Sequence, residues 1–239
     1  LKHLEIRGRC YTDFIISAPR LIKFYWNKMM HSKYSIENQS TLEIVNLDVD
    51  IPIANGLPAF EEGNGNRMIK CLKGLHNVKH LGLSAPLLEA ITQRPPELEN
   101  CATPFSNLRY LCLETWLTKG CFQSIMFLLE KSLNVETLVL RISPDLGHIL
   151  DLVKQGQVET SLKLKLNNLR FVEFRGVVGC LDELEYLKVL LNNAVTLKKM
   201  AIIMTTRKWS VLYKKRLSSF NEEVLALPRA SSDVTISFS

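Results

Sequence analysis

The sequence predicts an α/β fold in which short parallel strands stack side by side into one sheet, with helices or loops on the opposite side. Three observations lead to this prediction. An L-x-x-L-x-L pattern of apolar residues recurs along the whole chain. Amphipathic helical segments stand between several of its copies. Hydrophobic residues make up 46% of the 239 residues, so the chain can bury a large core.

The repeated pattern fits neither a helix nor a plain alternating strand. In the copy "LRYLCL", Leu111 and Leu113 are two residues apart and point to the same side of a strand, whereas Leu108 can turn into the same apolar layer. One such strand cannot bury its own apolar pair, so the copies must stack. Numbered from its first residue, each copy has six positions. The eight copies begin at Leu1, Leu21, Leu42, Val78, Leu108, Val135, Leu169 and Leu197.

These copies indicate a leucine-rich-repeat solenoid. Successive copies begin 20 to 36 residues apart, compared with roughly 20–29 residues in leucine-rich repeats, which predicts an irregular horseshoe. Its parallel sheet is expected on the concave face, and its helices or loops on the convex face. We expect leucine-rich repeats over residues 1–160 and a C-terminal region over residues 161–239 that continues and caps the solenoid.

The segments between the copies are of two kinds. Some carry an apolar stripe with helical spacing, and one of these has Asp182 and Glu183 in its first turn, where acids suit the helix dipole. Others hold paired prolines or turn formers without any period, which predicts loops. Helices are predicted over residues 67–75, 120–133 and 180–193, and irregular insertions over residues 52–66 and 92–104.

The end of the chain alternates apolar and polar residues. Val234, Ile236 and Phe238 are separated by Thr235 and Ser237, which predicts a strand with one apolar side. The last repeat of a solenoid needs a cap, because its sheet edge would otherwise stay open. We therefore expect this strand to close the sheet beside the last repeats.

The net charge of +6 is unevenly distributed. Residues 163–216 carry twelve Lys and Arg residues against four Asp and Glu residues, and the rest of the chain is slightly acidic. A basic surface can bind nucleic acid or an acidic partner. Runs of charge more often form a solvated outer surface, and we do not expect nucleic acid as a partner.

The sequence offers no catalytic or metal-binding motif. Its six cysteines include no C-x-x-C pair, and its five histidines form no H-E-x-x-H motif and no zinc-binding spacing with Cys. The stretch "GNGNR" at Gly63 lacks the preceding strand and the following G-K-[ST] of a phosphate-binding P-loop. We therefore expect a protein that is not an enzyme and that needs no metal or cofactor.

Two observations bear on the compartment. No apolar run approaches the roughly eighteen residues of a membrane-spanning helix, and no signal peptide is evident. Cysteines without a disulfide framework suit reduced thiols, so we expect a cytoplasmic or nuclear protein without a membrane partner. The chain starts at Leu1, inside a copy and without Met, and we expect it to be part of a longer protein.

The strand pattern also nominates binding residues. Along each strand, every second side chain is exposed on the concave face, which forms a preformed surface for a protein target. Aromatic and Arg side chains tend to contribute most interface energy. Alternatively, each is an ordinary solvated sheet residue, which is the commoner case. The candidates are Tyr25, Tyr110, Arg141, Phe171 and Arg175.

Three arginines share one position of the pattern, the residue after the sixth. Arg7, Arg141 and Arg175 occupy it, and the copies of the last two are consecutive. Side by side, Arg141 and Arg175 would form a site for a carboxylate or a phosphate. The alternative is that the neighbouring Glu114 and Glu173 neutralise them.

Residues 168–204, followed by residues 225–239, resemble the FBD region of plant F-box/leucine-rich-repeat proteins. The similarity rests on Val172-Glu173-Phe174, Gly176, the acidic helix start, "LLNNAVTLKKM" and the Pro228-Arg229-Ala230-Ser231 stretch. Upstream, "SAPRLIKFYW" and "PFSNLRYLCLE" are similar to the repeats of that family. The F-box of the family, which docks onto the SCF adaptor subunit, is not found in this sequence.

This resemblance implies the substrate-binding arm of an SCF-type (cullin-RING) ubiquitin ligase, with a protein target of unknown identity. The adaptor subunit is expected as a partner only if an F-box precedes Leu1. Two alternatives remain. One is a small-molecule or phosphate sensor on a leucine-rich-repeat scaffold, and the other is a truncated protein that lacks an F-box and has no ligase role.

Overall fold

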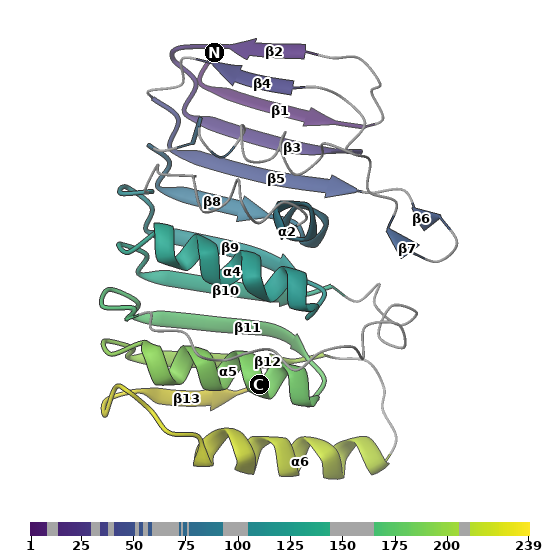
Figure 1. Cartoon of the computed structure of the whole chain (residues 1–239), viewed down its shortest axis with the longest axis vertical. Helices are drawn as coiled ribbons and strands as arrows, with labels where there is room; N and C mark the ends of the chain where they lie inside the picture. Colours follow the sequence, from purple (N-terminus) through teal and green to yellow (C-terminus); the bar gives the residue numbers. More distant parts are fainter. Residues whose placement is uncertain are drawn as a thin grey trace.

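The computed structural model describes most of the chain (Figure 1). The described residues are 1–8, 14–29, 34–37, 41–50, 53–54, 57–58, 72, 74–75, 77–92, 105–143, 165–205 and 211–239. Its main element is a nine-stranded sheet in which every neighbouring pair is parallel and the strand order follows the chain order. The predicted α/β class with a parallel sheet is therefore confirmed.

The strands begin where the repeated pattern predicts them. The first eight each start at the third position of a copy, and the ninth is the predicted closing strand at the chain end. The third positions are also paired with one another from strand to strand, so the copies are in register across the sheet. The strands are β1 (His3–Arg7), β3 (Lys23–Met29), β5 (Ile44–Asp50), β8 (His80–Leu83), β9 (Tyr110–Thr115), β10 (Thr137–Ile142), β11 (Phe171–Val177), β12 (Lys199–Met204) and β13 (Thr235–Phe238).

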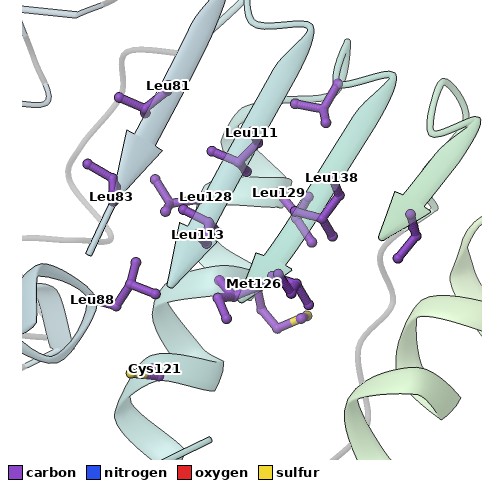
Figure 2. Packing of buried hydrophobic residues seen from close by; sticks show 14 of the residues in the cluster. Leu81, Leu83, Leu88, Leu111, Leu113, Cys121, Met126, Leu128, Leu129 and Leu138 are labelled. Atoms are coloured by element: carbon purple, nitrogen blue, oxygen red, sulfur yellow. The ribbon is translucent and has the colours of Figure 1, made fainter. Parts of the chain in front are cut away.

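The apolar positions form one continuous core. The predicted core residues Leu111, Leu113, Leu138, Leu140, Val172 and Phe174 are all 0% exposed. Helices cover this layer, and Figure 2 shows Leu128 and Leu129 lying against Leu113 and Leu138. The described helices are α2 (Ala85–Thr92), α4 (Lys119–Lys131), α5 (Leu181–Asn193) and α6 (Val211–Ala226).

Two of the predicted helices are confirmed. α4 lies within the predicted segment 120–133 apart from its first residue, and Thr118 caps it by accepting a hydrogen bond from the backbone N–H of Cys121 at 3.0 Å. α5 lies within the segment 180–193. Sequence analysis did not predict α2 or α6. The predicted helix over 67–75 and the insertion over 92–104 fall almost entirely outside the described residues.

The first return segments differ from the later ones. A separate parallel pair, β2 (Phe14–Ser17) with β4 (Tyr34–Glu37), supplies strands where the later repeats have helices (Figure 1). Ile16 of β2 is buried in the main core. Within the predicted insertion over 52–66, the described residues form a short antiparallel pair, β6 (Ile53–Ala54) with β7 (Leu57–Pro58).

A ladder of Asn and Thr side chains joins the turns that lead into the strands. Each of these residues stands just before the first position of a copy, and most of them donate to carbonyl oxygens of the preceding turn. Asn107 instead donates to the side-chain oxygen of Asn77 at 3.3 Å. Thr41 Oγ1 donates to the oxygens of Pro19 and Leu21, both at 2.9 Å. Asn168 Nδ2 donates to the oxygen of Leu133 at 2.9 Å. The ladder satisfies turn carbonyls that have no sheet partner. Sequence analysis missed it, although six copies share the signal: Thr41, Asn77, Asn107, Asn134, Asn168 and Thr196.

The closing strand is confirmed in the predicted place. β13 pairs in parallel with β12, with Ile236 opposite Met200 and Phe238 opposite Ile202. The turn before it is fastened by Ser231, whose buried hydroxyl donates to the oxygen of Leu197 at 2.8 Å. The tail therefore covers the edge of β12.

Deletion of residues 232–239 is expected to promote aggregation. It uncovers the edge of β12, whose buried Met200 and Ile202 lie beside the tail, and exposed sheet edges pair with other chains. Light scattering and thermal unfolding of the shortened and complete chains check this. A shortened chain that stays monomeric with an unchanged melting temperature would show that the tail has no capping role.

Candidate functional site

The side chains at positions three, five and seven of the copies form a face of the main sheet that we call the open face. In β9, the open-face residues Tyr110, Cys112 and Glu114 are half-buried, whereas the alternate residues are buried under the helices. Because the strands are in register, these positions align in three rows across the sheet. The rows run perpendicular to the strands and place residues of neighbouring copies side by side, although these residues are far apart in the sequence.

All five predicted binding residues lie on the open face. Tyr110, Phe171 and Tyr25 are half-buried, and Arg141 and Arg175 are exposed. Four of the five come together on the neighbouring strands β9, β10 and β11, where Arg141 is paired in register with Arg175. Tyr25 lies on β3, separated from β9 by β5 and β8. The structure thus concentrates the candidates in the C-terminal half of the sheet.

Two Tyr rings on this face contact His rings. His80 and Tyr110 are stacked, with centroids 5.4 Å apart and planes at 23°. His3 and Tyr25 make a tilted contact at 5.2 Å. Partial burial raises the pKa of the Tyr110 hydroxyl, with a smaller rise from Cys112 and an opposing effect of Arg141. Stacking restricts these rings before any partner binds, which lowers the entropy cost of using them as contacts.

The arginine row is present, but its two members differ. Arg175 Nε donates to Glu173 Oε1 on its own strand, in an ion pair that raises the pKa of Arg175. Arg141 lies between Glu114 and Arg175 in register and has no carboxylate within ion-pair distance in the described part of the chain. The neighbouring Glu173 therefore neutralises Arg175, whereas the Arg141 guanidinium is available to a partner.

A small pocket opens on this face between β5 and β10. Its volume is about 200 Å³, and it carries both acidic groups and the guanidinium of Arg141. Gly82 shapes it, because a side chain there would start 2.2 Å from Asn46 Oδ1, so only Gly lets Asn46 lie across β8. Sequence analysis missed the pocket, although a Gly inside a strand was a signal. It is lined by Asn46, Asp48, Leu83, Ser84, Cys112, Glu114 and Arg141.

The described residues show neither a metal site nor a membrane segment. No three His, Cys, Asp or Glu side chains in the described ranges gather where they could hold a metal ion. None of the described helices is both long and apolar enough to span a membrane. The described cysteines Cys112, Cys121 and Cys180 are free thiols.

Comparison with known proteins agrees with the sequence resemblance. Residues 165–202 match the FBD family. A protein of Arabidopsis thaliana, named as an F-box/FBD/LRR-repeat protein, is 26% identical over 180 residues. The chain is thus similar to the F-box/FBD/LRR-repeat proteins of plants. The match covers 70% of this chain but 36% of the relative, so the chain spans about a third of that relative's length.

The FBD match covers β11, α5 and most of β12. Gly176 sits at a bulge between β11 and β12 with φ of 81°, a left-handed conformation that favours Gly. Glu183, in the first turn of α5, is buried and accepts three backbone N–H bonds, from Val178 at 2.8 Å, Gly179 at 2.6 Å and Cys180 at 2.9 Å. Burial raises the pKa of Glu183, and these bonds limit the rise.

The turn held by Glu183 also anchors α6. Arg216 Nε donates to the carbonyl oxygen of Gly179 at 2.6 Å, and Phe220 of the same helix is buried against this region. The FBD match thus contains the junction that connects the last strands to the C-terminal helix. Its most buried charge serves structure, whereas the candidate binding residues lie on the opposite side of the sheet.

Proposed function

We propose that the chain is a non-catalytic protein-recognition module, a leucine-rich-repeat solenoid whose open face binds a protein target. The observation that carries this proposal is the register of the main sheet, which aligns the open-face residues of eight copies in continuous rows. Such a surface is formed before binding, so little ordering entropy is lost on association. In this proposal residues 1–160 are the repeats, and residues 161–239 are the FBD-like cap.

The family supports a more specific role. We place the chain in the substrate-binding arm of an SCF-type cullin-RING ubiquitin ligase, because the name of the Arabidopsis relative combines an F-box with the FBD and repeat parts. The F-box would dock onto the adaptor subunit while the repeats hold the target. A cytoplasmic or nuclear location agrees with the free thiols of Cys112, Cys121 and Cys180.

Co-precipitation with the SCF adaptor subunit tests the ligase role. The protein as encoded by its complete gene is expected to capture the adaptor, whereas residues 1–239 alone are not. If the complete protein fails to capture it, the ligase role is wrong and the chain is a recognition protein without ligase function. Target binding by the open face is tested separately and does not depend on this result.

The open-face pocket favours a protein target over a small molecule. Its volume of about 200 Å³ is below the roughly 300–1,000 Å³ of typical ligand pockets. Around it, aromatic and charged side chains spread over several strands, as at a protein interface. A sensor of small molecules would need a deeper enclosure than this face offers in the described residues.

Arg141→Ala combined with Arg175→Ala is expected to weaken target binding by about 1–3 kcal/mol, because Arg side chains at the centre of an interface often contribute this much. The target is first identified by proximity labelling, and affinities are then measured at matched salt. Arg7→Ala is the matched control, since Arg7 occupies the same position in β1 and pairs with Glu5 at 2.5 Å, as Arg175 does with Glu173. Equal affinity of the double variant and the parent would remove both arginines from the proposed interface.

A further inference from the structure

Three cations cluster where β11 and β12 begin. Arg170, Lys198 and Lys199 are all exposed, and the backbone N–H groups of both lysines donate to the Arg170 carbonyl oxygen at 2.9 and 3.1 Å. None of the three has a carboxylate within ion-pair distance in the ranges that the structure describes. We call Arg170, Lys198 and Lys199 the basic cluster.

The same positions are neutralised in the preceding repeats. Lys79 pairs with Glu43 at 2.7 Å. Arg109 pairs with Glu136 at 3.5 Å and also donates to two carbonyl oxygens of its own turn and to one, of Asn134, in the next turn. Each of these two cations therefore has a carboxylate partner from one adjacent copy. This pairing ends at β11 and β12, where neither Arg170 nor Lys198 has a carboxylate partner in the described residues.

Three other cations of residues 163–216 have partners in the described part of the chain. Arg175 pairs with Glu173, and Lys188 lies 3.8 Å from Glu185. Arg216 donates to the Gly179 oxygen. In the described residues, the basic cluster therefore brings together unpaired cations of two adjacent copies, and its charge calls for an anionic partner.

An aromatic ring lies beside the basic cluster. Phe171 follows Arg170 directly, is half-buried on the open face, and is paired in register with Lys199. Tyr110 lies two strands away in the same row, with Thr137 between them. The surface thus offers cations that can bind carboxylates and, one residue along the chain from Arg170, the Phe171 ring for an apolar contact.

We propose that the basic cluster and Phe171 bind an acidic segment of the target protein, one that carries two or three Asp or Glu side chains next to an apolar side chain. This inference rests on the proposed recognition function and names the chemistry of its partner. The exposed cations supply charge-assisted hydrogen bonds, and Phe171 supplies the apolar contact.

A protein segment fits this surface better than nucleic acid. Proteins that bind duplex DNA with useful affinity contact about six to ten phosphates, and the cluster offers three cations. Glu136 stands just before β10 and Glu173 lies on the adjacent strand β11, so a phosphate backbone that extended along the sheet would meet carboxylates. A short acidic segment stays within the cluster.

Fluorescence anisotropy with the complete chain of residues 1–239 tests the proposal. The probes are a labelled Glu-rich peptide with one Phe, and the same peptide with Gln in place of every Glu. The parent is expected to bind the Glu peptide more tightly, and more weakly as ionic strength rises. Arg170→Gln combined with Lys198→Gln and Lys199→Gln is expected to weaken this binding about tenfold, since each exposed ion pair contributes a few-fold at most.

Lys2→Gln combined with Lys23→Gln is the matched control. Lys2 holds position two of the first copy, as Lys198 does in the last, and Lys23 holds position three of the second copy, as Lys199 does in the last. The backbone N–H of Lys23 donates to the Lys2 carbonyl oxygen, as that of Lys199 does to the Arg170 oxygen. The control is expected to leave Glu-peptide binding unchanged. No binding of the Glu peptide, equal binding of both peptides, or an equal loss in both variants would overturn the proposal. Tighter binding of a single-stranded oligonucleotide would also overturn it, in favour of nucleic acid.

A second readout separates this proposal from the recognition function itself. With the target found by proximity labelling, Tyr110→Ala is expected to weaken binding because its ring lies on the open face. The basic-cluster variant is expected to weaken it as well. Loss with Tyr110→Ala but not with the cluster variant would keep the recognition function and reject the acidic segment.

Discussion

Leu111→Asp is expected to lower the free energy of unfolding by about 4 kcal/mol or more, because it places a carboxylate in an apolar layer without a partner. Leu111 is fully buried and lies in the middle of the sheet, paired in register with Leu81 on one side and Leu138 on the other. Chemical denaturation followed by circular dichroism measures the change. The damage should spread to both neighbouring copies, since each repeat is stabilised by those beside it.

Leu111→Ala keeps this prediction testable if the Asp variant does not fold. It is expected to cost about 2–5 kcal/mol, the range for large-to-small changes in a packed core. Thr137→Asp is the control, because Thr137 is half-buried on the open face of the neighbouring strand and should change stability by less than about 1 kcal/mol. An unfolding midpoint of Leu111→Asp equal to that of the parent would contradict the assignment of the core layer.

Glu183→Ala is expected to have the second large effect, a loss of about 3 kcal/mol in the free energy of unfolding. The substitution leaves the N–H groups of Val178, Gly179 and Cys180 without their acceptor, and an unsatisfied buried donor costs about 1–3 kcal/mol. Because Arg216 is anchored to Gly179 in the same turn, α6 should loosen as well. Hydrogen exchange measured by mass spectrometry would show reduced protection in α6.

Glu185→Ala is the matched control on the same helix. Glu185 is half-buried and its described partner is Lys188, at 3.8 Å, an exposed pair that contributes about 0–1 kcal/mol. Glu183→Gln, which retains one oxygen acceptor, should fall between Glu183→Ala and the parent. If Glu183→Ala were as stable as Glu185→Ala, the three N–H bonds would contribute nothing measurable to the free energy of unfolding.

The strands could be predicted from the sequence because their signal is local. The L-x-x-L-x-L pattern is sufficient to predict strand starts at its third position, as at His3, Tyr110 and Lys199. Register followed, because the same positions are apolar in every copy and a slip of one residue would turn the apolar pairs away from the core. The return segments were harder to predict. Those that became β2 and β4 carry no such repeated pattern.

The candidate binding residues were predicted only in part. The positions of Tyr110, Phe171, Arg141 and Arg175 within their copies were sufficient to place them on one face. The register of β9, β10 and β11 brings them together. Position could not show that Glu173 binds Arg175 along the same strand. It also could not show the pocket beside Arg141, because that depends on how Asn46 lies over Gly82.

The sequence by itself determined the parallel sheet, its strand positions and the side of each strand that faces the core, because these depend on the spacing of apolar residues along the chain. Only the tertiary structure decided which charges have partners. Lys79 and Arg109 face carboxylates from the adjacent copies, whereas Arg170, Lys198 and Lys199 have no carboxylate partner in the described residues. The reason is physical: an ion pair needs two side chains within about 4 Å, and in this sheet the nearest neighbours come from copies 20 to 36 residues apart in the chain.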